Sequence, residues 1–216
     1  MQLSLRRAGM HDDGVIKYHC EWQPSKTVES EMLNQLIAWR DRLHTIGLIG
    51  VYPDGIGFGN VSSRLRTQSF LITGTQTGHH TTTTPAHYTL VDAWDIDRNQ
   101  LHCVGSVKAS SESLTHAALY EYSATIQAII HIHHPELWSM YQDKLPTTVA
   151  DVPYGTPAMA YEMWRLFQDT ELASQKILVM AGHEDGLMAF GETLESAAMI
   201  LLDLLGMSSD KVTLMS

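Results

Sequence analysis

Three histidines stand within four positions in the segment AIIHIHHPELW, residues 128 to 138. Imidazole nitrogens bind divalent metals, and a catalytic zinc site takes about three protein ligands and one open position. The apolar run before the histidines predicts a buried strand, on which side chains alternate between two faces. His131 and His133 then share one face, while His134 points to the other. The spacing favours a metal site, although a histidine at a strand end can also be an ordinary surface or core residue.

A third metal ligand is expected at His183, within LVMAGHEDGLMAFG. This histidine follows an apolar strand and precedes a turn that contains glycine, a place where side chains face a site rather than the core. Two strands of one sheet would bring His183 beside His131. The alternative is a solvated loop histidine.

Glu112 lies in ASSES, at the start of a predicted helix. A carboxylate beside a metal is positioned to take a proton from a substrate. A glutamate in the first turn can also do no more than complement the helix dipole. His116 and Tyr120 follow at intervals of four and therefore share a helical face with Glu112, which makes that face unusually polar if it is buried.

Two stretches have features of an anion site. The segment TGTQTG, residues 73 to 78, combines hydroxyl groups with glycines that let a phosphate approach the backbone N–H groups. Ser110 and Ser111 stand at the predicted start of a helix, where N–H groups also attract anions. Neither stretch matches a nucleotide-binding motif. Taken singly, each is equally compatible with an ordinary turn or helix cap.

The elements that must position these residues alternate along the chain. The apolar stripe from Met32 to Ile46 predicts a helix that opens near Ser25 or Thr27 and ends at Gly47. Further helices are predicted from Ser110 or Ser111, from Pro157, and after a cap at Thr193. Strands are predicted at SFLIT, TLVDAWD, IQAIIHIHH, KILVMAG and GLMAFG. Interspersed helices and strands without a linker predict one α/β or α+β domain.

The composition excludes several classes of protein. The chain has 216 residues, of which 44% are hydrophobic and 18% are charged, and its formal net charge is -10. A net negative chain with no run of Lys or Arg is not expected to bind nucleic acid or an anionic membrane. No segment reaches the ~20 apolar residues of a membrane span, and no export signal is visible. Cys20 and Cys103 do not form a CxxC pair and are expected to be reduced thiols. We therefore expect a cytoplasmic location.

The motifs together carry a more specific signal. GNVSSR, LITGTQTG, SSE, HAALY, AIIHIHHP and GHEDGLMAFGETLESA occur in an order and spacing that resemble the class II aldolase/adducin family. The resemblance is strongest over residues 28 to 205 of a single domain spanning 1 to 216. It implies a three-layer α/β/α sandwich around a central, largely antiparallel sheet. The third histidine departs from the family's NHG-like context, because here it lies in GHEDG.

The resemblance also implies roles for individual residues. It implies a Zn2+ ion, or another divalent metal, held by His131, His133 and His183, with Glu112 as the acid/base residue. A tyrosine proton donor, often from a neighbouring subunit, belongs to the family's aldolases, but no motif marks it among the eight tyrosines. A homotetramer is the expected assembly. The positions that match the family's phosphate site are Asn60, Thr73, Gly74, Ser110 and Ser111.

The function implied is that of a metal-dependent lyase acting on a small sugar or sugar phosphate. Retro-aldol cleavage of a ketose would proceed through an enediolate that the metal stabilises. The same apparatus serves epimerisation, by cleavage and rejoining, and dehydration of a ketose phosphate. An alternative of another class is a non-catalytic assembly module like the adducin head domain. Metal content distinguishes these readings, because an assembly module need hold no zinc.

Overall fold

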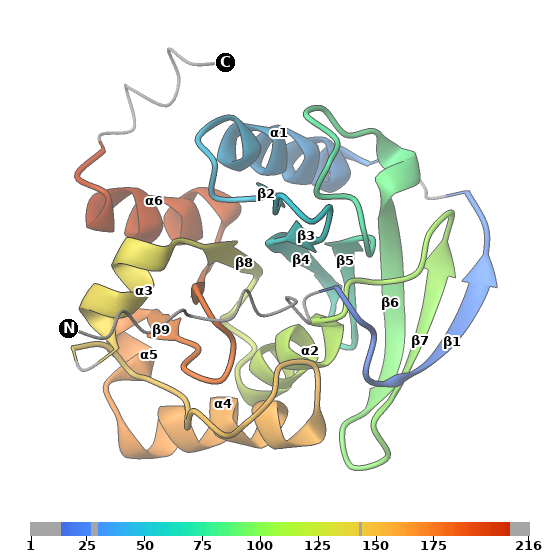
Figure 1. Cartoon of the computed structure of the whole chain (residues 1–216). Helices are drawn as coiled ribbons and strands as arrows, with labels where there is room; N and C mark the ends of the chain where they lie inside the picture. The colour runs from blue at the N-terminus through green and yellow to red at the C-terminus, as the bar shows by residue number, and fades with distance from the viewer. Residues whose placement is uncertain (1–13, 27–29, 143, 208–216) are drawn as a thin grey trace.

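The computed structural model describes residues 14–26, 30–142 and 144–207. Figure 1 shows a central sheet with helices packed against it. The strands are β1 (His19–Pro24), β2 (Gly50–Val51), β3 (Gly57–Phe58), β4 (Asn60–Arg66), β5 (Ser69–Thr73), β6 (Tyr88–Asp95), β7 (Gln100–Gly105), β8 (Ala128–His133), β9 (Ile177–Val179) and β10 (Gly186–Gly191). The helices are α1 (Glu31–Thr45), the 3-10 turn η1 (Pro85–His87), α2 (Ser113–Tyr122), α3 (Pro135–Tyr141), α4 (Pro157–Asp169), α5 (Leu172–Gln175) and α6 (Leu194–Leu204).

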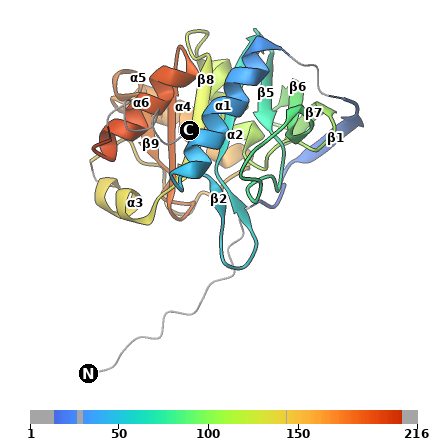
Figure 2. The ribbon, with the colours of Figure 1, turned by 90° about the horizontal axis from the view of Figure 1, so that it is seen from above.

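The main sheet has eight strands in the order β1-β7-β6-β5-β4-β8-β10-β9. Every neighbouring pair is antiparallel except β1 and β7, which run parallel. The sequence predicted a largely antiparallel sheet, and this prediction is confirmed. β2 and β3 form a separate hairpin that stands out from the body of the molecule (Figure 2).

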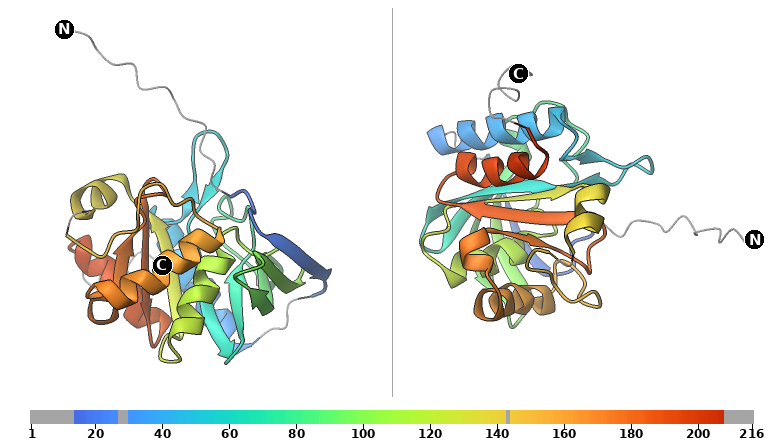
Figure 3. Two further views of the ribbon diagram at one scale, coloured as in Figure 1. Left: turned by 90° about the horizontal axis from the view of Figure 1, so that it is seen from below. Right: turned by 90° about the vertical axis from the view of Figure 1, so that its left-hand side faces the viewer.

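Helices cover both faces of the sheet, which confirms the three layers. α1 and α6 lie on one face, and α2, α4 and α5 lie on the other (Figure 3). The alternation along β8 feeds both cores, because Ile130 and Ile132 pack on the α1 side while Ile129 packs on the α2 side. No helix among the described residues is both long enough and apolar enough to span a bilayer.

The predicted start of the first long helix is wrong. α1 begins at Glu31, because the Ser30 side chain accepts the N–H of Leu33 at 3.2 Å and so caps the helix. Ser25 instead continues the edge of the sheet, where its N–H donates to the Gly105 carbonyl at 3.1 Å. Thr27 lies outside the described residues. The end at Gly47 is as predicted, with a φ of 78° that favours glycine.

The start of α2 also differs from the prediction. The N–H of Ser110 donates to the Thr73 carbonyl at 3.2 Å, and Ser113 N–H donates to the Ser110 carbonyl at 3.0 Å. Residues 110 to 112 therefore form a turn tied to β5, and the helix begins at Ser113. This turn holds Ser110, Ser111 and Glu112 beside the ends of β5 and β8.

Candidate metal centre

Two of the histidines come from the middle of the sheet. β8 lies between β4 and β10, where His131 pairs with Asn60 on one side and with Met188 on the other. Alternation along the strand places His131 and His133 on the face opposite Ile130 and Ile132. His134 leaves the strand and caps α3 by accepting the N–H of Leu137 at 3.3 Å. Of the three histidines in this segment, only His131 and His133 thus face the site.

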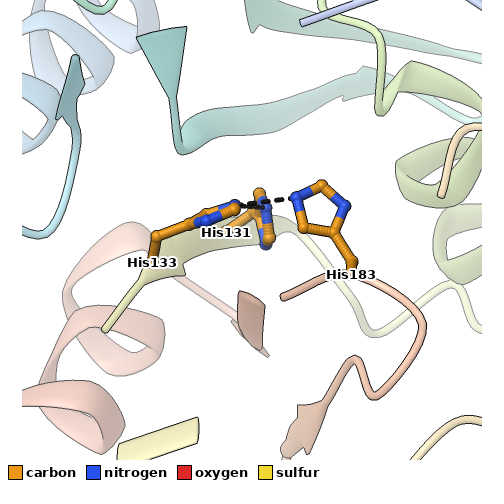
Figure 4. Close-up of side chains that lie close together, drawn as sticks. All are labelled: His131, His133 and His183. Carbon is orange, nitrogen blue, oxygen red and sulfur yellow. Dashed lines mark hydrogen bonds between the residues drawn. The ribbon is translucent and has the colours of Figure 1, made fainter. Parts of the chain in front are cut away.

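His183 joins them from the turn between β9 and β10. Its N–H donates to the Met180 carbonyl at 3.1 Å, and its carbonyl accepts from Gly186 N–H at 3.0 Å. Gly186 packs closely against the site, because a Cβ there would lie 3.1 Å from atoms of both the His131 and His183 rings. The turn so brings the third ring onto the face of β8 that carries the other two (Figure 4).

The ring nitrogens of the histidines converge. His133 Nε2 lies 3.0 Å from His131 Nε2 and 2.8 Å from His183 Nε2. Because one nitrogen carries at most one proton, His133 Nε2 cannot donate to both neighbours. Ligands about 2.0–2.1 Å from a tetrahedral zinc ion lie about 3.3 Å apart, close to these separations. His131 Nδ1 donates to the Leu187 carbonyl at 3.1 Å, which leaves its Nε2 lone pair for the centre. The three residues, all buried, therefore fit a divalent metal.

Glu112 faces the same centre from the turn before α2. Its side chain is 2% exposed, with Oε1 3.1 Å from His183 Nδ1 and Oε2 3.6 Å from His131 Nε2. It makes no capping hydrogen bond to α2, so complementing a helix dipole does not account for where the carboxylate points. Burial raises the pKa of Glu112, but His131 and His183 outweigh burial and lower the pKa to about 2. The carboxylate is thus held ionised against two imidazoles.

The polar face of α2 continues behind Glu112. Ser62 Oγ lies 2.7 Å from His116 Nδ1 and 2.8 Å from the Tyr120 hydroxyl, all three side chains being buried. Burial lowers the pKa of His116 to about 3 against the opposing effect of Glu112, so this imidazole is neutral. The polar face of α2 is therefore buried, as a functional role for it requires. Ser62 of β4 supplies hydrogen-bond contacts to two of its side chains.

Four of the five residues matched to the phosphate site line the cleft that contains the histidines and Glu112. They are Asn60, Gly74, Ser110 and Ser111. The buried Asn60 Oδ1 has no hydrogen-bond partner among the described residues, and Ser110 Oγ accepts the Glu112 N–H at 3.4 Å. Gly74 brings its backbone to the cleft, but its N–H already donates to the His87 carbonyl at 2.8 Å.

Thr73 is placed differently from the other four. Its hydroxyl accepts the Val61 N–H at 3.2 Å inside the sheet, and Thr73 is not among the residues that line the cleft. The four residues that follow Gly74, from Thr75 to Gly78, do line it. The cleft has no Lys or Arg among the described residues that border it.

Sequence reasoning missed two aromatic neighbours of the histidines. The Tyr52 hydroxyl lies 2.6 Å from His133 Nδ1, and the Tyr154 ring centroid lies 4.4 Å from that of His183. Tyr52 stands in the β2–β3 hairpin beside Phe58, whose ring centroid is 5.5 Å from that of His133. No motif in the sequence marked either tyrosine, because both contacts join segments far apart in the chain.

The comparisons with known proteins agree with this architecture. A family model described as the Class II Aldolase and Adducin N-terminal domain matches residues 54–205. The comparison with curated proteins found no match. Among solved structures, an L-fuculose 1-phosphate aldolase superposes with a TM-score of 0.59 and 20% identity, covering 88% of this chain and 96% of that one.

Two further solved structures show the same fold. The L-fuculose-1-phosphate aldolase from Thermus thermophilus superposes with a TM-score of 0.56 and 19% identity, covering 85% of this chain and 93% of that one. A sugar-phosphate aldolase from Thermotoga maritima gives a TM-score of 0.60 at 16% identity, covering 86% and 95% respectively. At these identities the likeness is one of fold.

Proposed function

Because the chain belongs to the class II aldolase and adducin N-terminal domain family, we propose that it is a metal-dependent lyase that cleaves a ketose by retro-aldol chemistry. The observation that carries the proposal is the convergence of His131, His133 and His183 on one point with Glu112 beside them. Burying three imidazoles and a carboxylate this close together is costly, so the cluster favours a role that uses them. An assembly module need hold no metal, so metal content separates it from the lyase.

The roles proposed for the residues follow from their positions. His131, His133 and His183 hold the metal, which when bound supplies Lewis acidity to polarise a carbonyl. Glu112 moves the proton: cleavage removes a proton from a hydroxyl, breaks the adjacent C–C bond to release an aldehyde, and returns a proton to the carbon left behind. The carboxylate lies beside the point where the histidines converge, and this position lets it accept the proton and return it. The distal anion of the substrate, which we propose is a phosphate, is bound by Asn60, Ser110 and Ser111. Thr73 lies within the sheet, where its carbonyl accepts the Ser110 N–H and so supports the turn that carries the two serines.

Four finer assignments complete the proposal. We assign zinc as the metal, a homotetramer as the assembly, the cytoplasm as the location and a single domain over residues 1–216. The family supports a divalent metal, and the all-histidine ligand set suits zinc. Epimerisation or dehydration on the same site would use the same proton transfer, and the products distinguish them from cleavage.

The test is a screen of ketoses and ketose phosphates with purified protein, before and after treatment with a chelator. We expect release of an aldehyde from at least one phosphorylated ketose, loss of this activity with chelator, and recovery on adding Zn2+. Glu112→Gln protein serves as the matched control for contaminating aldolase. Purified protein that binds no divalent metal, or cleavage that is insensitive to chelator, would contradict the proposal.

A further inference from the structure

The loop that borders the cleft rests on a buried arginine. Residues Thr75 to Gly78 follow β5 and form one wall of the cleft, and the loop continues to η1. Beneath it, Arg40 of α1 is 0% exposed and is among the largest fully buried side chains of the described residues. Burying a guanidinium is costly unless its donors are satisfied, so the partners of Arg40 indicate what it does.

The partners of Arg40 are backbone carbonyls of this loop. Its Nη2 donates to the carbonyls of Thr77, at 2.8 Å, and Gly78, at 3.3 Å. Its Nη1 donates to the carbonyl of His80. The planar guanidinium thus fixes the direction of three peptide groups in four residues.

Asp41, the next residue of α1, contacts the same loop as a hydrogen-bond acceptor. The Asp41 carboxylate accepts the Thr83 N–H at 3.0 Å and the Thr83 hydroxyl at 2.9 Å. Asp41 Oδ1 also lies 3.2 Å from Arg40 Nη1, so much of the charge is neutralised within the pair. Arg40 and Asp41 therefore set the direction of the loop's peptide groups and contribute little net charge.

The direction matters because a trans peptide points its N–H opposite to its C=O. With the carbonyls of Thr77 and Gly78 turned to Arg40, the N–H groups of Gly78 and His79 turn away from α1. Gly78 borders the cleft, and it packs so closely that an added Cβ would lie 2.1 Å from the Gly50 carbonyl oxygen. Backbone N–H groups can bind an anion without any cationic side chain, and the cleft, which Gly78 but not His79 borders, has no Lys or Arg among its described lining residues.

We propose that Arg40 and Asp41 are positioning residues that clasp the 77–83 loop so that the Gly78 N–H, at the wall of the cleft, serves the oxyanion of the substrate. This inference rests on the proposed function only in that the cleft receives an anionic sugar. The oxyanion is a phosphate or a carboxylate, which share the chemistry of N–H recognition.

The experiment compares Arg40→Lys with Arg42→Lys, a change two residues along the same helix. Arg42 lies over the Trp39 ring, 5.2 Å from its centroid, and serves as the control. Calorimetry of the metal-loaded protein would measure Kd for inorganic phosphate and, separately, for acetate. We expect Arg40→Lys to raise the Kd of the preferred anion by roughly tenfold or more, because at least one hydrogen bond to the anion is lost. Arg42→Lys should leave it unchanged, and the Kd for metal should be unchanged in both.

Thr83→Val provides a second test of the proposal if Arg40→Lys does not fold. This variant removes the hydroxyl that donates to Asp41 and that lies 3.0 Å from the Tyr88 hydroxyl, and it should raise the anion Kd in the same direction with the far-UV circular dichroism intact. Wild-type anion affinity in a folded Arg40→Lys protein would overturn the inference, and so would an equal loss of metal and anion affinity. Wild-type protein that binds neither anion would also overturn it, whereas chelator-sensitive cleavage of an unphosphorylated ketose would leave the proposed function standing.

Discussion

The hydroxyl of Tyr52 lies 2.6 Å from Nδ1 of His133, the ring nitrogen that faces away from the other two histidines. The Leu187 carbonyl occupies the equivalent position at His131 Nδ1, 3.1 Å away. Such contacts fix the orientation and tautomer of a metal-binding imidazole. The β2–β3 hairpin, which stands out from the sheet, thereby contacts the candidate metal centre through the Tyr52 hydroxyl, with the Phe58 ring also beside His133.

Tyr52→Phe should weaken metal binding by about 10–100-fold, the usual effect of losing such a contact to a ligand. Competition of the metal-free protein with a chromogenic chelator measures the Kd. Tyr122→Phe is the control, because Tyr122 is 41% exposed and its ring stacks on Phe167, away from the histidines. An unchanged Kd in Tyr52→Phe would show that His133 is oriented without the hairpin.

His133→Ala should abolish stoichiometric metal binding, whereas His134→Ala should retain it. The two residues are adjacent, but His133 faces the centre and His134 caps α3 through Leu137 N–H. Loss of that hydrogen bond should cost about 1 kcal/mol of unfolding free energy. Metal analysis of both purified variants by mass spectrometry provides the comparison. Retention of metal by His133→Ala and its loss from His134→Ala would reverse the assignment of faces along β8.

Glu112→Gln should lower turnover by roughly 10²–10⁴ while metal remains bound, because an amide cannot take up the proton and the three histidines persist. A residue that only complemented the helix dipole would cost ~0.3–1 kcal/mol of stability and leave turnover intact. Turnover and metal content are measured on one preparation. Glu121→Gln, further along α2, alters an exposed carboxylate that accepts the Trp94 Nε1–H at 2.9 Å and should be inert. Full activity with full metal in Glu112→Gln would remove this residue from the mechanism.

Ser111→Ala should raise the Michaelis constant for a phosphorylated ketose more than for its unphosphorylated analogue. Ser111 lines the cleft beside Glu112, at a turn whose N–H groups attract anions. Steady-state kinetics on the two substrates test this. The control is Ser106→Ala, which removes an exposed hydroxyl bonded to the Ser25 carbonyl. Equal effects on both substrates would point to an unphosphorylated sugar.

Asp92→Asn should lower the pKa of His102 and change how stability depends on pH. The hydrogen bond from His102 to Asp92, 2.5 Å between Nδ1 and Oδ1, raises the pKa of His102 in the folded protein. A raised pKa means that the folded state holds the proton more tightly, so the stabilisation is full below the unfolded pKa of about 6.5 and is lost as pH rises through the folded pKa. Nuclear magnetic resonance titration of His102 and denaturant unfolding at several pH values measure both effects. An unchanged titration curve in Asp92→Asn would contradict the pairing.

The sequence predicted features that depend on local pattern. The alternation of β8 placed His131 and His133 on one face, and the motif order led to the family and to the layered fold. The local context of His183, after an apolar strand and before a turn, made it a candidate, but its place beside His131 depends on the pairing of β8 with β10, which no local pattern shows. The starts of α1 and α2 were misplaced because several serines compete as caps, and distant carbonyls of Gly105 and Thr73 decide among them. The contacts of Tyr52 and Arg40 join segments far apart in the chain, and no local pattern reports them.

The position of β8 within the sheet also constrains how the protein is made. Ile130 pairs with Val61, synthesised long before it, and with Ala189, synthesised long after it. Until β10 leaves the ribosome, one edge of β8 is unpaired although every residue of this strand is buried in the finished sheet. Exposed apolar edges recruit other chains, and contacts between distant positions form slowly. Nascent chains or fragments that stop before Gly186 should therefore depend on chaperones or aggregate, because β10 is the strand that covers the remaining edge of β8.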